Sequence, residues 1–176
     1  MSRKSVIIAS FLAICVVCVV SGIVCGAFAL RAHSEVVIDP NTYYPVTYVV
    51  DGDTFKALVN QKEITVRVLG INTPETVDPR KPVECYGPEA SKQAKALLDG
   101  HKVRLVFNPN RETMDKYGRY LMYAYRDDGL FYNEAMIKDG YAMEYTVGTP
   151  YSFQSEFRVD QKIAQKAALG LWGACK

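Results

Sequence analysis

The stretch R-V-L-G-I-N-T-P-E, residues 67–75, decides the fold of this chain of 176 residues. Apolar residues just before it and at its start alternate with polar ones and predict a β-strand with one buried face: Ile64, Val66 and Val68. Arg67 then belongs to the opposite face. Gly70 allows the chain to turn, and Pro74 restricts its own φ and the conformation of the residue before it. We therefore expect a strand that runs into a loop carrying an arginine, an amide and a carboxylate.

The sequence on either side of this stretch supplies the other elements of a small barrel. Its patterns predict five strands, at residues 46–50, 55–59, 63–69, 103–107 and 120–125. They also predict three helices, at residues 88–98, 133–138 and 152–168. Three successive strands followed by a helix and two more strands are typical of a five-stranded OB-fold β-barrel. The predicted fold class is therefore α+β, and the fold alone does not indicate a function.

The N-terminal part of the chain differs in kind from the rest. Residues 5–30 form an apolar run without charge or proline, long enough to span a bilayer as a helix. Two basic residues precede this run and favour an orientation with the N-terminus inside the cell. We expect residues 1–34 to be a transmembrane signal anchor or a signal peptide, residues 35–43 a linker, and residues 44–176 the barrel domain.

Two fates of this N-terminal segment stay open. The segment Ala27-Phe28-Ala29 resembles a cleavage site for a secretory signal, so the domain is either held at the cell membrane or secreted after cleavage. Cys25 follows Gly-Ile-Val, which lacks the small residue expected just before a lipid-modified cysteine, and a lipoprotein ranks third. In each case we expect the domain to lie outside the cell.

Net charge and cysteine usage limit the possible partners and compartments. From residue 41 onward the chain has 18 Lys and Arg against 17 Asp and Glu, so any argument for nucleic acid must rest on local arrangement.

Cys85 and Cys175 are the two cysteines of this part. In an oxidising compartment they could pair and close a loop of about 90 residues, which would remove several kcal/mol of unfolded-state entropy. The alternative is two free thiols.

The residue types that are present exclude several kinds of active site. Beyond residue 35 the chain has one histidine, His101, which argues against a zinc cluster, a Ser-His-Asp triad and a Cys-His pair. Neither a G-x-x-x-x-G-K-[ST] nor a G-x-G-x-x-G motif occurs, so nucleotide-triphosphate and dinucleotide folds lose support. Oxygen ligands and guanidinium groups remain.

Three polar segments, residues 51–54, 67–75 and 115–119, could together hold a cation and a phosphate diester. Asp53 in the motif D-G-D-T, the side chain of Asn72 and the carbonyl of Thr73 could supply oxygen ligands to a hard cation such as Ca²⁺. Each of these segments alone is more often a turn or a loop cap than a metal site.

Hydrolysis of a phosphodiester also needs an activated water and positive charge at the phosphate. Glu75 could orient or deprotonate the water. Arg67 and Arg119 could each bind phosphate oxygens through two parallel hydrogen bonds, which a lysine cannot do.

Taken as a series, these motifs resemble the staphylococcal nuclease (thermonuclease) family. The resemblance rests on D-G-D-T, R-V-L-G-I-N-T-P-E-T, Y-G-P-E-A-S, D-K-Y-G-R and N-E-A, and covers residues 44–172. It implies an OB-fold barrel with three helices and Ca²⁺-dependent endonuclease activity on single-stranded DNA, double-stranded DNA and RNA. By position it implies catalytic roles for Arg67, Glu75 and Arg119, and metal ligation by Asp53 and Thr73. It implies substrate contacts by Lys116, Tyr117 and Tyr145. We expect a monomer and predict no protein partner.

One departure from the family pattern bears on function. Where the family's best-known member has an aspartate metal ligand, this chain has Asn72, which keeps an oxygen donor but removes one negative charge. Ca²⁺ should therefore bind more weakly unless Asp51, Glu75 or Asp78 compensates. This leaves a rival hypothesis open: an OB domain that binds nucleic acid or protein at the cell envelope with weakened catalysis. A purely structural envelope domain would leave the polar segments without a role.

Overall fold

The computed structural model describes residues 36–80 and 82–175. Their strands are β1 (Tyr43–Val49), β2 (Thr54–Val59), β3 (Lys62–Val68), β4 (Ile71–Asn72), β5 (Lys102–Phe107), β6 (Tyr120–Arg126) and β7 (Met143–Glu144). Their helices are α2 (Gly87–Leu98), α3 (Tyr132–Lys138), α4 (Gln154–Lys166) and α5 (Leu171–Ala174).

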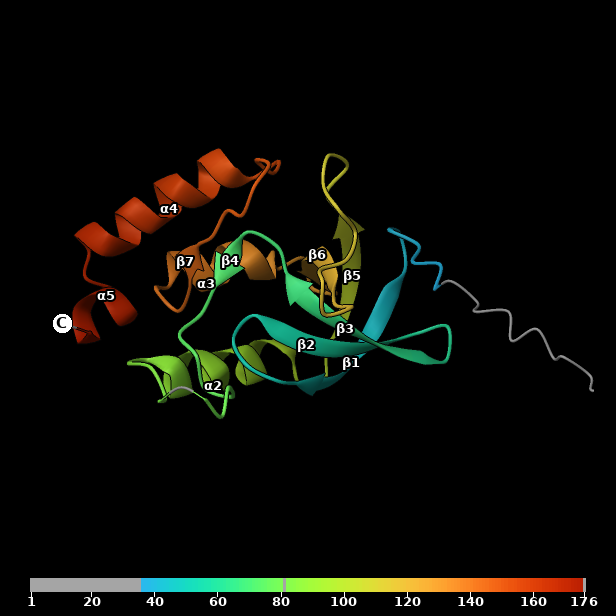
Figure 1. Ribbon diagram of the computed structural model, residues 1–176, viewed down its shortest axis with the longest axis horizontal. Helices are drawn as coiled ribbons and strands as arrows, with labels where there is room; N and C mark the ends of the chain where they lie inside the picture. Colours follow the sequence, from blue (N-terminus) through green and yellow to red (C-terminus); the bar gives the residue numbers. More distant parts are fainter. Residues whose placement is uncertain (1–35, 81, 176) are drawn as a thin grey trace, which may run out of the picture. The chain divides into compact units, whose positions relative to one another are not determined.

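Five of the strands form a closed barrel in the order β1-β2-β3-β6-β5, with β1 pairing with β5 to complete the ring (Figure 1). All neighbours are antiparallel except β3 and β6, which are parallel. A closed five-stranded barrel with added helices is consistent with the predicted OB-type architecture. The five predicted barrel strands are thereby confirmed, with ends that differ by at most three residues.

The alternation in β3 has the predicted consequence for burial. Ile64, Val66 and Val68 are all under 5% exposed and belong to the core, while Arg67 between them faces away from it. On one side β3 pairs with β2, so that Arg67 lies opposite Thr54. On the other side it pairs with β6, so that Arg67 lies opposite Leu121. The strand pairing therefore brings three distant chain segments to the polar end of β3.

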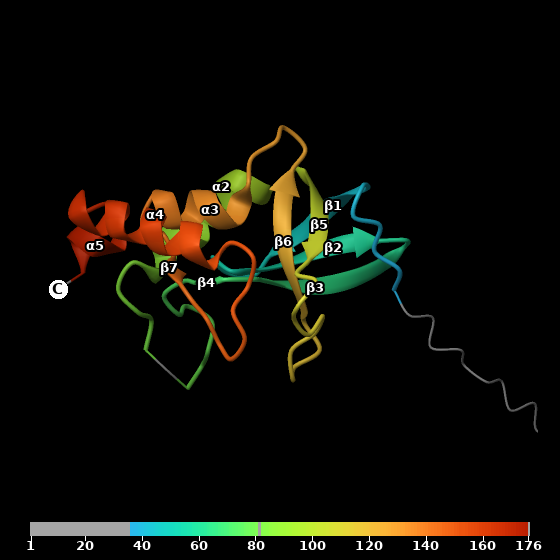
Figure 2. The same cartoon turned by 90° about the horizontal axis from the view of Figure 1, so that it is seen from above.

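The helices gather on one side of the barrel strands in both views (Figures 1 and 2). Helix α3 packs against α4 and β6, and α2 packs against β1. Aromatic side chains fill the contact between barrel and helices, including Tyr123 edge-on to Phe153 and Phe131 beside Phe157. This packing fixes the segment after α3, which leads through β7 to Tyr145 and Val147. These two residues form part of one wall of the site.

Three features of the described residues differ from the expectation. There are four helices rather than three, because the chain turns at Gly170 into the short helix α5. A second sheet of two strands, β4 and β7, pairs Ile71 with Glu144 and Asn72 with Met143. Strands of two residues carry no periodicity, so neither was predicted. The predicted helix at residues 152–168 is shorter in the structure, spanning Gln154–Lys166.

Cys85 and Cys175 form a disulfide, the pair named from the sequence, with their Cα atoms 5.9 Å apart. It joins a position two residues before α2 to the residue that follows α5. None of the helices described in residues 36–80 and 82–175 has the length and hydropathy needed to cross a membrane. The predicted transmembrane run at residues 5–30 lies outside the described residues and stays a prediction.

Candidate active site

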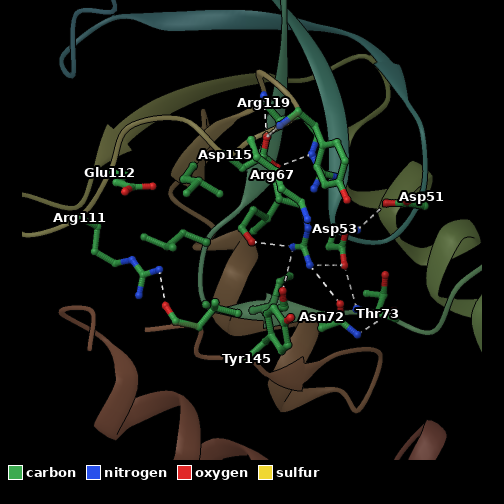
Figure 3. A pocket seen from close by; sticks show the side chains of 18 of the residues that line it. Asp51, Asp53, Arg67, Asn72, Thr73, Arg111, Glu112, Asp115, Arg119 and Tyr145 are labelled. Atoms are coloured by element: carbon green, nitrogen blue, oxygen red, sulfur yellow. Dashed lines mark hydrogen bonds and ion pairs between the residues drawn. The ribbon is translucent and has the colours of Figure 1, made fainter. Parts of the chain in front are cut away.

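The polar residues singled out from the sequence gather in one cleft beside the end of β3 (Figure 3). The cleft has a volume of about 650 Å³. Its lining includes all nine residues predicted as catalytic, metal-binding or substrate-binding: Arg67, Glu75, Arg119, Asp53, Asn72, Thr73, Lys116, Tyr117 and Tyr145. Residues from segments far apart in the sequence thus share one solvent-accessible space, while their individual roles stay predictions.

Arg67 is held in the cleft by four acceptors. Its Nη2 lies 3.0 Å from Asp53 Oδ2 and donates to Asn72 Oδ1 at 3.1 Å. Its Nη1 donates to the carbonyl oxygens of Val68 and Ile71 at 2.9 and 2.8 Å. The side chain is 11% exposed, so the guanidinium is fixed by the protein before any ligand arrives. Such preorganisation is what a group that stabilises charge requires.

Asp53 connects the D-G-D-T turn to the loop after β4. Its Oδ2 accepts the backbone N–H of Thr73 at 2.9 Å, and its Oδ1 accepts the hydroxyl of Thr54 at 3.0 Å. Gly52 is required beside it, because an added Cβ would lie 2.5 Å from a side-chain carbon of Thr73. These contacts place the Asp53 carboxylate against the carbonyl-bearing loop of residues 72–73.

Asp51 is a further acid of the cleft, and sequence reasoning named it only as a possible compensating charge. Its Oδ1 accepts the backbone N–H of Asp53 at 3.0 Å. Burial raises the pKa of Asp51, and the neighbouring charge of Asp53 raises it further, against the opposing effect of Arg67. This end of the cleft therefore concentrates negative charge that a bound cation would neutralise.

Asn72 uses both ends of its amide within the protein. Its Oδ1 accepts a hydrogen bond from Arg67, and its Nδ2 donates to the carbonyl oxygen of Thr73 at 3.3 Å. An aspartate could make the first of these contacts but not the second. The asparagine therefore takes up one of the two acceptor positions of the Thr73 carbonyl, which is one of the predicted metal ligands.

The oxygen donors fit a hard cation in kind. Asp51, Asp53, the Asn72 amide and the Thr73 carbonyl are the ligand types that Ca²⁺ accepts. The donor set is low in charge, however: within the described residues no group of three or more Asp, Glu, His or Cys side chains is placed to hold a metal. These donor types fit a hard cation better than zinc, which prefers nitrogen and sulfur ligands.

Glu75 follows Pro74 at the mouth of the same cleft. Its Oε1 accepts the backbone N–H groups of Val77, Thr76 and Asp78 at 2.8, 2.9 and 3.1 Å. The hydrogen bond from Val77, with those from Asp78 and Thr76, lowers the pKa of Glu75, so the carboxylate is ionised at neutral pH. An ionised carboxylate in a fixed orientation can accept a proton from water or hold that water in place.

Arg119 enters the cleft from the loop that precedes β6, and Asp115 organises that loop. Asp115 Oδ2 accepts from Arg119 Nε at 2.7 Å, and its Oδ1 accepts the backbone N–H groups of Tyr117 and Arg119 at 2.9 and 3.0 Å. Burial acts to raise the pKa of Asp115, but the hydrogen bonds from Arg119 and Tyr117 outweigh it and the pKa lies below its usual range. Because the ion pair uses Nε, the outer nitrogens of Arg119 can still point at a ligand.

Two tyrosines lie in the cleft with their rings accessible to solvent. Tyr117 is 70% exposed, with the Lys116 ammonium 5.0 Å and the Arg119 guanidinium 5.3 Å from the centre of its ring. Tyr145 is 49% exposed, and its backbone N–H donates to the Gly70 carbonyl at 3.0 Å. Exposed rings flanked by cations suit the stacking of nucleic-acid bases next to phosphates.

Arg111 is a lining residue that sequence reasoning missed. Its guanidinium donates to the carbonyl of Val147 at 2.6 Å and to that of Thr149. It thereby ties the loop after β5 to the loop after β7 and completes one wall of the cleft (Figure 3). No local motif marks it, because the partners are backbone carbonyls some 36 to 38 residues away in sequence.

The fold and the cleft together define a closed-barrel protein with a polar site. Two arginines and an ionised glutamate share this site with a cluster of oxygen donors around Asp53. The chain belongs to the staphylococcal nuclease family: residues 65–174 match the family described as Staphylococcal nuclease homologue.

Several named proteins are similar to this chain over 70% or more of its length. It is 38% identical to the Thermonuclease of Staphylococcus hyicus over 129 residues, which is 73% of this chain and 75% of that protein. It is 40% identical to Endonuclease YncB of Bacillus subtilis over 124 residues, 70% of this chain and 58% of YncB. The Thermonuclease of Staphylococcus intermedius matches at 38% over 129 residues, again 75% of its length.

Proposed function

We propose that the protein is a nuclease that hydrolyses phosphodiester bonds of DNA and RNA in a Ca²⁺-dependent reaction. The observation that carries this proposal is the meeting of Arg67, Glu75 and Arg119, from three separate segments, in one cleft beside Asp53. Family membership adds support, since similar proteins are named thermonuclease and endonuclease. A hydrolase acting on ester bonds is the activity that this combination of groups supports best.

Each residue has a chemical task in this proposal. Glu75, ionised and fixed by backbone N–H groups, orients a water molecule and accepts its proton. Arg67 and Arg119 donate hydrogen bonds to the phosphate oxygens on which negative charge grows. Calcium, when bound by Asp53, Thr73 and Asn72 with Asp51 nearby, supplies further positive charge at the phosphate.

The substrate contacts explain why both DNA and RNA are proposed. Tyr117 and Tyr145 offer ring faces to unpaired bases, and Lys116 offers a cation to the phosphate backbone. Stacking and phosphate contacts carry little sequence information and do not need a 2′-hydroxyl. We therefore propose single-stranded DNA, double-stranded DNA and RNA as substrates, with single strands cut fastest because their bases are accessible.

We further propose that the enzyme works outside the cell, as a monomer. The apolar run at residues 5–30 supports a membrane anchor, with secretion after cleavage as the alternative. The Cys85–Cys175 disulfide supports an oxidising compartment. Trypsin added to intact cells that express the full chain would remove the barrel domain, whereas protection would place the domain inside.

The deciding experiment is cleavage of single-stranded DNA by the full-length protein in mild detergent, with calcium or with a chelator. We expect cleavage with calcium and none with chelator. Arg119→Lys should lower kcat by about 100-fold, because an ammonium cannot supply the paired donors of a guanidinium. Arg104→Lys is the matched control: Arg104 lies over the Tyr125 ring outside the cleft, so activity should stay within about twofold.

One observation favours the rival proposal, a binding module with weakened catalysis. Both terminal nitrogens of Arg67 already donate to acceptors within the protein, and Asn72 donates to the Thr73 carbonyl. A folded protein that retains single-stranded DNA on a filter at saturating calcium, but leaves it uncut, would establish the binding module and reject the nuclease.

A further inference from the structure

Glu84 holds the backbone of Glu75 at both of its polar groups. The N–H of Glu75 donates to Glu84 Oε2 at 2.9 Å, and the N–H of Glu84 donates to the carbonyl oxygen of Glu75 at 2.9 Å. These two hydrogen bonds close the loop that leads from β4 to α2. Neither the family resemblance nor the sequence motifs assigned any role to Glu84.

The orientation of the Glu75 carboxylate depends on this closure. The carboxylate is fixed by the N–H groups of the three residues that follow it, so it turns together with its own backbone. Two contacts tie this turn to residues farther along the chain: the Glu75 N–H donates to the Glu84 carboxylate, and the Thr76 hydroxyl lies 3.2 Å from that of Ser91. Loss of the Glu84 contact would let the turn rotate as a unit, and the carboxylate with it.

The disulfide extends this anchoring beyond the loop. Cys85, the residue after Glu84, is bonded to Cys175, which follows α5 at the end of the described chain. The start of α2 packs closely against the same loop. An added Cβ on Gly87 would lie 2.6 Å from the methyl carbon of Thr76 and 3.1 Å from the Glu75 carbonyl oxygen. The closing end of the loop is thus fixed from the C-terminal helices on one side and from α2 on the other.

We propose that Glu84 is a positioning residue for Glu75, and that the Cys85–Cys175 disulfide keeps Glu84 in place to do so. The inference deepens the proposed function, on which it rests for the task of Glu75. Glu84 touches neither phosphate nor water in this scheme. It acts through the direction of the Glu75 carboxylate, and the disulfide makes that direction depend on a covalent link to the C-terminus.

The kinetic test compares Glu84→Ala with Glu84→Gln at saturating calcium. Glu84→Ala should lower kcat by about 10- to 100-fold, since small misplacement of a catalytic group has effects of this size, while KM stays within about twofold because phosphate and base contacts come from other segments. Glu84→Gln should restore most of kcat, because its amide oxygen still accepts the Glu75 N–H. Glu89→Ala, which removes an exposed carboxylate from the first turn of α2, is the control.

A second readout does not depend on cleavage. Hydrogen exchange of the amides of residues 75–78 should speed up about tenfold or more in Glu84→Ala, while amides of β2 and β3 keep their rates. If the wild-type protein does not cut nucleic acid, the proposed function fails, and exchange still decides whether Glu84 anchors the loop. Unchanged exchange in Glu84→Ala overturns the inference, and so does an unchanged kcat in an enzyme that cuts.

The contribution of the disulfide is tested with the double variant Cys85→Ser and Cys175→Ser. We expect the same fall in kcat and the same faster exchange at residues 75–78, with the barrel amides protected. Brief reduction of the folded wild-type protein by a phosphine gives a second route to the open form if the double variant does not fold. Full kcat and unchanged exchange after complete reduction would reject the disulfide's part.

Discussion

At the scale of single residues, Asn72 determines how much negative charge the cleft offers to a cation. The side chain accepts from Arg67 and donates to the Thr73 carbonyl. Asn72→Asp should therefore tighten Ca²⁺ binding in two ways, by adding one charge and by releasing that carbonyl from its N–H partner. We expect the dissociation constant for calcium, measured by calorimetric titration, to fall by about tenfold.

The control for this prediction is an asparagine elsewhere on the surface. Asn110 is exposed and lies outside the residues that line the cleft, so Asn110→Asp adds the same charge without changing the site. It should leave the calcium affinity unchanged within about twofold. Equal gains in both variants would mean that overall charge, and not ligation at residue 72, sets the affinity.

A second prediction at this scale concerns Asp160, a buried acid on α4. The residue is 9% exposed, and its Oδ2 has no hydrogen-bond partner among the residues that the structure describes. Burial raises the pKa of Asp160, Lys138 partly opposes this, and Glu134 and Glu156 add to it. Because the folded pKa lies above the unfolded value, the ionised form is less favourable in the folded protein and destabilises it at neutral pH.

Asp160→Asn should therefore raise the free energy of unfolding at pH 7. The gain should shrink as the pH falls towards the ordinary aspartate pKa of about 3.9, and vanish below it, where the wild-type side chain is protonated in both states. Urea unfolding at pH 7 and at pH 3 measures both ends. Asp99→Asn, at an exposed site after α2, should change stability by less than about 0.5 kcal/mol. A loss of stability in Asp160→Asn at pH 7 would contradict the prediction.

At the scale of elements, the small sheet of β4 and β7 depends on a glycine. Gly70 has φ +82°, its carbonyl accepts the Tyr145 N–H and the Tyr151 hydroxyl at 3.0 and 3.1 Å, and an added Cβ would lie 2.7 Å from the Tyr151 ring. Gly70→Ala combines backbone strain with a steric clash. We expect a loss of about 2–4 kcal/mol in the free energy of unfolding, from both effects together.

Gly129→Ala separates the two contributions. Gly129 has a similar φ of +93°, but nothing lies within 4 Å of its added Cβ. It should lose only about 1 kcal/mol, the cost of the backbone conformation alone. If both substitutions cost the same in urea unfolding, the contact with Tyr151 has no role in holding β4 against the barrel.

Local pattern was enough to predict the barrel strands but not the walls of the cleft. The alternation around Val66 and the D-G-D-T turn are contained within a few residues, and their consequences for burial follow directly. The small sheet and the Arg111 contacts depend on loops that meet only after the barrel has closed, so no window of sequence contains them. Glu84 was missed for the same reason, since its partner is nine residues away across a loop without periodicity.

Site residues were predictable in kind because the chemistry needs particular groups, and their meeting in space was implied by the family resemblance. What could not be predicted from the sequence was which hydrogen bonds these side chains make within the protein. Arg67 is bound by four acceptors, Asn72 by a donor and an acceptor, and Asp115 by the backbone of its own loop. These hydrogen bonds decide how far each group can move towards a ligand, and they form only in the folded geometry.

At the scale of the whole molecule, the disulfide spans 90 residues of sequence and so encloses the barrel strands β5 and β6 and all of the described helices. Such a link limits the unfolded chain far more than the folded one, and the chain-entropy relation gives a contribution of about 4–5 kcal/mol for a loop of this size. Replacing both cysteines by serine should lower the free energy of unfolding by that amount. It should also raise the urea m-value, because an unlinked unfolded chain exposes more surface. A fall in stability with an unchanged m-value would show instead that the loss arises in the folded state, from the loosened loop around Glu84.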